Sequence, residues 1–354
     1  MSDARRAHGY HRLTVKRVVT ETGDARSYLL DVPESLRPSF TYQPGQFCTF
    51  RVNIDGTEHL RSYSMSSAPG LDPDLTVTVK RVAGGVVSNC LIDSVHEGDE
   101  LELTRPAGVF CPRDADVPLL GFCGGSGITP VMAIAKHVLA RTERRVRLLY
   151  ANRDGASVIF ERALADLAAH YGPRLEVVHH LDSDSGYLSG KDLATFVGDD
   201  LAVDCYLCGP GPFMDLAETA LRGLGIDPER IYLERFLVEQ QEKEEAASSP
   251  TGSDVAPAGT DVPEQVTVIL NGKPTAVTYQ PGDTLLETAR RGGLRPPFSC
   301  EAGNCATCMA FLKEGTVRMR VNNALTPEEV AEGWVLTCQS LPSGQVVTVE
   351  YEAM

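Results

Sequence analysis

Four cysteines in the last part of this 354-residue chain constrain its fold more than any other feature. Three of them lie within nine residues and the fourth follows thirty positions later: Cys300, Cys305, Cys308 and Cys338. The residues between the first three are mostly small: Ala302, Gly303, Ala306 and Thr307. Small residues let the backbone fold tightly and direct its N–H groups toward whatever the thiols hold. We therefore expect this segment to wrap around a metal centre with four thiolate ligands.

The cysteine spacing also indicates which metal centre is bound. C-x4-C-x2-C with a distant fourth cysteine is typical of a [2Fe-2S] cluster, in which thiolates hold two irons. Zinc is the main alternative, but structural zinc sites usually combine two short C-x2-C pairs separated by a loop. Buried structural cysteines are a second alternative. Because three thiols share one loop here and the fourth is isolated, the spacing favours the iron–sulfur cluster over both.

The tail from about residue 265 to 354 resembles plant-type ferredoxin domains through this cysteine loop. The resemblance implies an α+β fold of the ferredoxin-like (β-grasp) type that holds a [2Fe-2S] cluster. Two positions depart from the commonest version of the loop. Ala306 stands where glycine is usual, and Glu301 stands where arginine is frequent. The glutamate is expected to place a negative charge next to the cluster.

The residues before the cysteine loop carry two strong local signals. Residues 266–279 alternate apolar and polar side chains around an Asn-Gly pair at position 271, which is typical of a tight hairpin turn. Residues 284–292 have a helical pattern, and Asp283 and Thr284 are candidates for the N-cap. A hairpin followed by a helix is therefore expected at the start of the tail domain.

Length and charge exclude several classes of protein. A chain of 354 residues is too long for one core and predicts two to three domains. The formal net charge of −15 argues against nucleic acid or an anionic membrane as a partner, and it favours an acidic docking face. The sequence contains neither the apolar core of a signal peptide nor an apolar run long enough to span a membrane. We therefore expect a cytoplasmic monomer whose other six cysteines are free thiols.

Residues 13–110 consist of short apolar segments separated by Pro-Gly, Asp-Gly and Gly-Gly turns, a pattern that predicts an antiparallel β-barrel. The segment Arg-Ser-Tyr-Ser at 61–64 offers a cation, hydroxyls and an aromatic ring, which can bind phosphate and stack against a flavin. Gly85 and Ser88 then open a predicted helix over 88–95, whose N-terminal amides form an anion site. Taken alone, an arginine on a strand is more often solvated or salt-bridged, and Ser88 is more often a plain N-cap.

From Val117 onward, strands alternate with helices, which predicts a doubly wound α/β domain with a parallel sheet. The first strand runs into a glycine-rich turn, GGSGITP at 124–130, and then into a helix, so a pyrophosphate can approach the backbone. A glycine turn by itself often only joins a strand to a helix. Cys205 and Cys208 are not expected to form a redox pair, because residues three apart on a strand point to opposite faces. Cys208 ends its strand, at the edge where open α/β sheets bind ligands.

These motifs in this order resemble the flavin and nicotinamide domains of the ferredoxin-NADP reductase superfamily, with its R-x-Y-S, G-x-x-S and C-G-P signatures. The resemblance implies that an arginine pairs with FAD phosphate, that a tyrosine contacts the isoalloxazine ring, and that a lysine and a serine lie near the pyrophosphate. It assigns the FAD site to Arg61, Tyr63, Ser64, Val79, Lys80, Gly85, Val87, Ser88, Glu234 and Phe236.

The same resemblance implies a dinucleotide site on the α/β domain. Its predicted residues are Gly124, Gly125, Gly127, Thr129, Arg153, Gly209 and Pro210. Thr129 and Cys208 are the predicted catalytic positions, because both fall where the nicotinamide would meet the flavin. Arg153 is the candidate for contact with a 2′-phosphate, but Asp154 follows it, and the expected cofactor is NADH rather than NADPH.

Composition changes abruptly between the α/β region and the tail. Residues 239–264 are polar, rich in Pro, Gly and Ser, and without apolar periodicity, which predicts a flexible linker. The predicted domains are an FAD-binding barrel over 1–112, an NAD(P)H-binding α/β domain over 113–238 and a [2Fe-2S] ferredoxin domain over 265–354.

The order of the three domains predicts a function. A nicotinamide releases two electrons together as a hydride and a [2Fe-2S] cluster accepts one, so a flavin between them can divide the pair. The order resembles reductase components of bacterial multicomponent oxygenases, with greatest likeness to the 3-ketosteroid 9α-hydroxylase type and then to the phenylacetyl-CoA epoxidase type. The resemblance implies electron transfer from NADH to a terminal oxygenase, of the Rieske type. The alternatives are a reductase for a di-iron epoxidase or a hybrid-cluster protein, and a non-catalytic flavin and iron–sulfur redox sensor.

Overall fold

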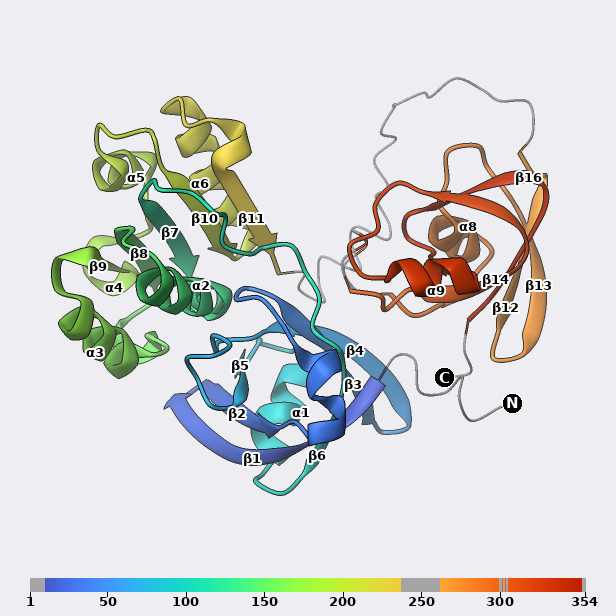
Figure 1. Ribbon diagram of the computed structural model, residues 1–354, viewed down its shortest axis with the longest axis horizontal. Helices are drawn as coiled ribbons and strands as arrows, with labels where there is room; N and C mark the ends of the chain where they lie inside the picture. The colour runs from blue at the N-terminus through green and yellow to red at the C-terminus, as the bar shows by residue number, and fades with distance from the viewer. Residues whose placement is uncertain (1–9, 237–261, 299–300, 302, 304, 352–354) are drawn as a thin grey trace.

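The computed structural model describes residues 10–236, 262–298, 301, 303 and 305–351, which form three packed domains joined in one chain (Figure 1). The predicted multidomain fold class is confirmed: an antiparallel barrel, a parallel α/β sheet and a ferredoxin-like domain. The linker predicted over 239–264 falls outside the described residues up to position 261, so the domain boundaries remain predictions. None of the described helices is both long and apolar enough to cross a membrane.

Within residues 10–111, antiparallel strands pair in the order β4-β3-β6-β1-β2-β5. A bridge between Met65 and Val77 joins the end of β4 to β5 and brings the two edges of the sheet together. Alternate residues such as Phe50 and Leu103 fill the interior. The elements are β1 (Tyr10–Thr22), β2 (Ala25–Asp31), η2 (Glu34–Phe40), β3 (Phe47–Ile54), β4 (Thr57–Ser64), β5 (Leu75–Lys80), α1 (Val86–Ser94) and β6 (Glu100–Thr104).

Between residues 117 and 236, parallel strands pair in the order β11-β10-β7-β8-β9. Helices cover both faces, and Tyr206 and Cys208 pack on one face while Cys205 and Leu207 pack on the other. The expected separation of Cys205 from Cys208 is therefore confirmed. The elements are β7 (Leu119–Gly124), η3 (Gly125–Gly127), α2 (Ile128–Arg141), β8 (Val146–Asn152), α3 (Glu161–Tyr171), β9 (Leu175–Leu181), α4 (Asp182–Ser185), α5 (Gly190–Val197), β10 (Asp204–Gly209), α6 (Gly211–Gly223) and β11 (Ile231–Arg235).

In the tail, a mixed sheet of order β13-β12-β16-β14-β15 packs against helix α8. Asn271 and Gly272 form the predicted hairpin turn with φ of 52° and 73°. Thr284 rather than Asp283 caps α8, because its side chain and Glu287 form a capping box. The elements are β12 (Gln265–Leu270), β13 (Lys273–Thr278), α8 (Leu285–Arg291), β14 (Met309–Met319), α9 (Pro327–Glu332), β15 (Trp334–Leu336) and β16 (Ser340–Glu350).

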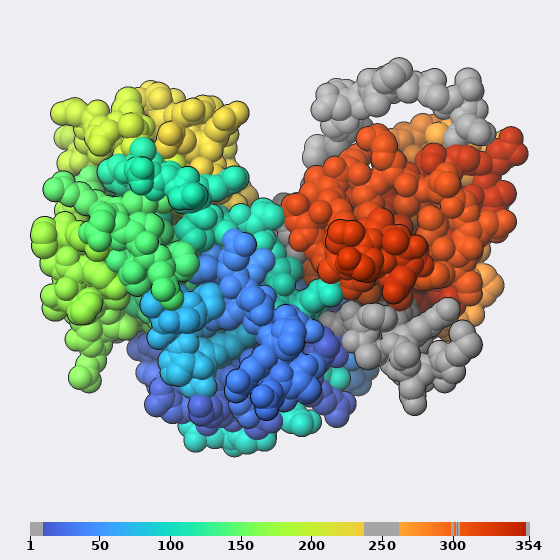
Figure 2. Space-filling model, viewed as in Figure 1, coloured from blue at the N-terminus to red at the C-terminus, as the bar shows by residue number. Residues whose placement is uncertain are grey.

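The barrel contacts both of the other domains (Figure 2). Toward the α/β domain, Lys136 Nζ on α2 lies 3.0 Å from Oδ2 of Asp72. Toward the tail, Arg105 Nη2 at the end of β6 donates to Glu329 Oε2 on α9 at 2.6 Å. The barrel therefore makes side-chain contacts with both the α/β domain and the tail domain.

Candidate flavin, nicotinamide and iron–sulfur sites

A cavity of about 330 Å³ lies where the barrel meets the α/β domain. It brings together the Arg-Ser-Tyr-Ser strand, the start of α1, the glycine-rich turn and the end of β10. It is lined by Arg61, Ser62, Tyr63, Ser64, Thr78, Lys80, Val82, Gly85, Val87, Ser88, Gly124, Gly125, Ser126, Thr129, Gly209, Pro210 and Phe236. Most residues predicted for the two cofactors thus line one shared cavity.

Strand β4 presents its functional side chains at the mouth of this cavity. The ring of Tyr63 packs edge-on against Phe50 of the barrel interior, with the centroids 5.4 Å apart, so its orientation is fixed. The guanidinium of Arg61 donates to the carbonyl of Leu60 at 2.7 Å. Val79, also predicted for the FAD site, lies in the barrel core and does not line the cavity.

Lys80, at the end of β5, reaches the glycine-rich turn of the neighbouring domain. A Cβ built on Gly125 would lie 3.5 Å from Lys80 Nζ. Burial lowers the pKa of Lys80, and the nearby carboxylate of Asp24 opposes that shift. A partly buried ammonium beside glycine backbone at the start of a helix fits an anionic group such as a pyrophosphate.

Helix α1 starts earlier than expected. Gly85 is its N-cap and the first helical residue is Val86, so the start predicted at Ser88 is wrong by two residues, as is the plain N-cap interpretation of Ser88. Ser88 lies in the first turn instead, where its hydroxyl accepts from the backbone N–H of Val82 at 3.1 Å. This bond closes the loop before the helix and turns the helix N-terminus toward the cavity.

The glycine-rich turn is required by the close approach of β10. A Cβ on Gly127 would lie 2.0 Å from the carbonyl oxygen of Cys208, and one on Gly124 would lie 2.8 Å from Cδ of Pro210. Gly125 has φ of 53°, in the region that favours glycine. These contacts explain why a glycine-rich segment joins β7 to α2 at this edge of the sheet.

The two predicted catalytic residues differ in their exposure to the cavity. Thr129 lines the cavity, and its hydroxyl donates to the carbonyl of Ser126 at 2.9 Å. Cys208 is fully buried behind the cavity wall, beside Cys123 on β7 and Glu234 on β11. Burial, and then Glu234, raise the pKa of Cys208 well above its usual value, so the group at this position is a neutral thiol.

Arg153 lies outside the cavity and is already engaged by acidic and polar neighbours. Its Nη2 donates to Ser157 Oγ at 2.9 Å, and its Nε lies 3.3 Å from Oδ2 of Asp154. Asp24 of the barrel lies 3.9 Å away. Gly127 and Glu234 also support the cavity from behind rather than line it.

Three of the four predicted cluster ligands are described, and all three are buried: Cys305, Cys308 and Cys338. Cys308 and Cys338 lie within hydrogen-bonding reach of each other although they are thirty residues apart. Cys300 lies outside the described residues. A Cβ on Gly303, whose φ is 75°, would lie 2.8 Å from the carbonyl oxygen of Val321. Cys305 and Cys308 on this tightly folded loop, with Cys338 beside Cys308, fit part of a [2Fe-2S] ligand set, and such a cluster accepts and releases single electrons when bound.

Sequence reasoning missed several features of these sites. Ser62, Thr78, Val82 and Ser126 line the cavity but were not predicted. Ser62 stands inside the Arg-Ser-Tyr-Ser motif and Ser126 inside the glycine-rich turn, so their positions in these motifs were the available signal. Glu301 was expected to add charge beside the cluster, but both of its carboxylate oxygens accept from Arg290 at 2.9 Å.

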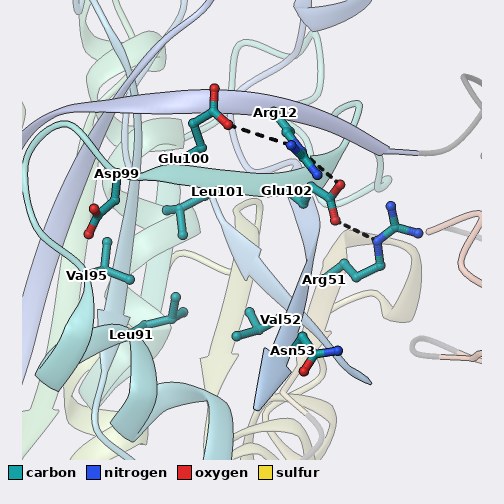
Figure 3. Close-up of a pocket in the computed structure, with 10 residues that line it drawn as sticks. All are labelled: Arg12, Arg51, Val52, Asn53, Leu91, Val95, Asp99, Glu100, Leu101 and Glu102. Carbon is teal, nitrogen blue, oxygen red and sulfur yellow. Dashed lines mark hydrogen bonds and ion pairs between the residues drawn. The ribbon is translucent and has the colours of Figure 1, made fainter. Parts of the chain in front are cut away.

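A second hollow, of about 450 Å³, opens on another part of the barrel (Figure 3). Three of its charged side chains pair with one another: Arg12 Nε lies 3.2 Å and Arg51 Nε 2.9 Å from the carboxylate of Glu102. Because these charges are mutually satisfied, they hold the strands together rather than offer an ion site.

Comparison with known proteins agrees with this architecture. The chain matches models described as oxidoreductase FAD-binding domain over residues 11–111, oxidoreductase NAD-binding domain over 122–219 and 2Fe-2S iron-sulfur cluster binding domain over 268–343. It is 41% identical over 346 residues to the ferredoxin reductase component of 3-ketosteroid-9-alpha-monooxygenase from Mycolicibacterium smegmatis, with 96% of each chain covered. It is 34% identical over 362 residues to a component of the 1,2-phenylacetyl-CoA epoxidase of Escherichia coli, with 97% and 98% covered.

Among solved structures, phthalate dioxygenase reductase shares the fold, with a TM-score of 0.58 and 22% identity over 98% of this chain and 99% of that one. The fold and sites therefore define an NAD(P)H-dependent oxidoreductase with FAD and a [2Fe-2S] cluster, as predicted. More particularly, the chain belongs to the family of oxygenase reductase components that includes the 3-ketosteroid-9-alpha-monooxygenase reductases.

Proposed function

We propose that this chain takes electrons from NADH and delivers them, through FAD and the [2Fe-2S] cluster, to the Rieske-type terminal oxygenase of a steroid 9α-hydroxylase-like system. The observation that carries the proposal is the shared cavity, in which the flavin strand and the glycine-rich turn face each other within reach of Lys80. A nicotinamide and a flavin bound there would meet directly, as hydride transfer requires.

The roles of the site residues follow from their chemistry. Arg61 and Lys80 supply cations for FAD phosphates, Tyr63 supplies a rigid aromatic surface, and the backbone of Gly85 and Val87 lies at a helix N-terminus. Ser64 and Phe236 bound the remaining cavity wall. Thr129 and the wall in front of Cys208 position the nicotinamide. Neither residue acts as an acid or base, because hydride transfer between two rings needs alignment rather than proton movement.

NADH is the proposed electron donor because Arg153 is engaged by Asp154, Ser157 and Asp24. A guanidinium already paired with carboxylates offers little gain to a 2′-phosphate, and the carboxylates would repel it. A ratio of kcat/KM that favours NADPH by tenfold or more, about 1.4 kcal/mol at the transition state, would reverse this assignment.

The second candidate is a reductase for a di-iron epoxidase, which is favoured by the 34% identity to the phenylacetyl-CoA epoxidase component over nearly the whole chain. Reconstitution with purified terminal components separates the two. Each component, one a Rieske steroid 9α-hydroxylase and one a di-iron epoxidase, is mixed with this chain and NADH, and product is measured by mass spectrometry. Product from the Rieske enzyme alone supports the proposal, and product from the epoxidase alone overturns it.

A control tests the electron path inside this chain without any terminal oxygenase. Reduction of cytochrome c by NADH needs only the internal electron path, so inactivity in this assay would place the fault in that path rather than in the choice of terminal oxygenase. Rapid reduction would also exclude a sensor without electron-transfer activity.

A further inference from the structure

Four side-chain hydroxyls form a row across the outer face of the barrel. Tyr10 on β1 pairs in register with Thr104 on β6, and Thr49 on β3 pairs with Ser62 on β4. The β3–β6 register brings Thr49 next to Thr104, where the Thr49 backbone N–H donates to Thr104 Oγ1 at 3.0 Å. We call these four residues the hydroxyl row.

The hydroxyl row begins at the flavin cavity. Ser62 lines that cavity, and its Oγ lies 2.9 Å from Oγ1 of Thr49. Thr49 is fully buried and Thr104 nearly so. The outer face of an antiparallel sheet usually meets water, so buried hydroxyls in a line across adjacent strands imply that something covers them.

The cluster loop of the tail domain covers this part of the row. Thr307, which stands between the ligands Cys305 and Cys308, lies with its Oγ1 3.4 Å from Oγ1 of Thr49. The side chain of Tyr10 also lies close to Thr307 and Cys305. Three hydroxyls, on Ser62, Thr49 and Thr307, therefore make a continuous series from the cavity wall to the loop that carries the cluster thiols.

Neighbouring charges hold this contact in place. Next to Thr104, Arg105 Nη2 donates to Glu329 Oε2 at 2.6 Å and to the carbonyl of Ala324 at 3.2 Å. The Glu329 side chain is only 9% exposed and also accepts from the backbone N–H of Thr326 at 2.8 Å, where it caps α9. A charged hydrogen bond is about twice as strong as a neutral one, so this pair is a latch between the two domains.

A further contact fixes the other end of the row. The guanidinium of Arg51 lies over the ring of Tyr10, 4.3 Å from its centroid. Figure 3 shows the ion pair with Glu102 that holds Arg51. Tyr10 is therefore held in place beneath the cluster loop.

We propose that the hydroxyl row is the seat on which the cluster loop docks to receive electrons, and that Ser62, Thr49 and Thr307 form the route between the flavin cavity and the cluster. The inference rests on the proposed function only for its internal step, from flavin to cluster, and not on the identity of the oxygenase. Each passage oxidises the flavin by one electron and reduces the cluster by one. An external one-electron acceptor must reoxidise the cluster before the second passage can deliver the other electron of the hydride, whose proton leaves to solvent.

Thr49→Val tests the route in the holoenzyme, because valine keeps the branched shape of threonine and replaces only its hydroxyl with a methyl group. Stopped-flow spectroscopy with NADH separates flavin reduction from cluster reduction. We expect hydride transfer to be unchanged and flavin-to-cluster transfer to slow by about tenfold. Thr49→Ser, which restores the hydroxyl, should recover the rate. An unchanged transfer rate in Thr49→Val, or a loss that Thr49→Ser does not recover, overturns the route.

Measurements without turnover test the docking seat. Arg105→Gln should raise amide hydrogen exchange in β6 and in residues 305–311, whereas Thr49→Val should not. Arg147→Gln is the matched control, because that arginine pairs with Glu176 at 2.6 Å within the α/β domain. If amide exchange does not change in Arg105→Gln, the latch is overturned.

A redox titration is the control for the route. The midpoint potentials of flavin and cluster must stay unchanged in Thr49→Val, since a shifted potential would assign the slower rate to driving force and overturn the route.

The outcomes are distinguishable from failure of the proposed function. Flavin-to-cluster transfer is measured within one chain, so it is observed whether or not any oxygenase accepts the electrons. If the chain supports no oxygenase but Thr49→Val still slows flavin-to-cluster transfer, the route stands and only the proposed acceptor is wrong.

Discussion

Gly127 of the glycine-rich turn lies against the carbonyl group of Cys208 at the end of β10, so closely that a Cβ would come within 2.0 Å of the oxygen. Contact of this kind joins the start of α2 to the carboxyl edge of the sheet. The turn is therefore shaped by its neighbour strand as much as by any ligand.

Replacing Gly127 by alanine should separate these two segments. Inserting a methyl group into a packed contact typically costs about 1 to 3 kcal/mol, and a displacement of about 1 Å near a reacting pair can cost about a hundredfold in rate. We expect slower flavin reduction by NADH with FAD still bound to the barrel. Gly155→Ala is the control, because nothing lies within 4 Å of its Cβ position. Equal rates in both variants would contradict the prediction.

Lys80→Met should affect stability and FAD binding in opposite directions. Burial lowers the folded-state pKa of Lys80 below its unfolded value, so the stability of FAD-free protein is reduced at neutral pH and rises as pH increases through the lowered pKa. Methionine removes this cost and also removes a cation from the phosphate site. FAD-free Lys80→Met should melt higher than the parent at neutral pH, with a difference that shrinks at alkaline pH, and should bind FAD more weakly. Calorimetry and FAD titration check both signs, and tighter FAD binding would refute the assigned role.

The Arg290–Glu301 pair should set part of the cluster potential. Glu301 directly follows Cys300 in the sequence, and its charge is neutralised by Arg290. Arg290→Gln should lower the midpoint potential by a few tens of millivolts and Glu301→Gln should raise it, because net charge near a cluster is one determinant of its potential. Lys313→Gln, which breaks a pair with Glu350 elsewhere in the domain, is the control. Redox titration monitored by EPR measures the shifts, and a shift of the same sign in both variants would exclude a charge effect.

Ala306→Gly should stabilise the cluster loop. Ala306 has φ of 57°, where an L-residue costs about 1 to 2 kcal/mol more than glycine, and glycine loses part of that gain through its freedom in the unfolded chain. We expect a net gain of about 0.5 to 1 kcal/mol, measured as slower loss of visible absorption on heating. Faster cluster loss in this variant would show that the Ala306 methyl group makes a contact that outweighs the backbone strain.

Cys208→Ala should lower the limiting rate of flavin reduction while changing NADH affinity little, because the space left behind the cavity wall would displace the nicotinamide from its alignment with the flavin, a loss that is felt mainly in the transition state. Because its pKa is raised, the thiol is neutral and the rate should not vary between about pH 6 and 8 through this group. Stopped-flow reduction at saturating NADH measures the effect. An unchanged limiting rate would mean that Cys208 only packs behind the cavity wall and that positioning falls to Thr129 and the backbone.

Much of the fold and of the candidate sites is predictable from local sequence. The Asn-Gly hairpin at 271 and the cap at Thr284 are each required by the backbone conformation of a few adjacent residues. The strand and helix periods are local as well. For the same reason the motifs identified most of the residues that line the shared cavity, because each motif carries its own backbone geometry wherever the chain places it.

The sequence by itself thus determined the three kinds of domain, their order and their cofactor classes, since these depend on short-range spacing. Only the tertiary structure decided which residues meet across domains. Arg105 and Glu329 are 224 positions apart, and Thr49 and Thr307 are 258 apart. Their contacts depend on strand register and on how one domain packs against another, and no local pattern records either. The pairing of Glu301 with Arg290 was hidden for the same physical reason: a charge on a loop is neutralised by a helix side chain that only folding brings beside it.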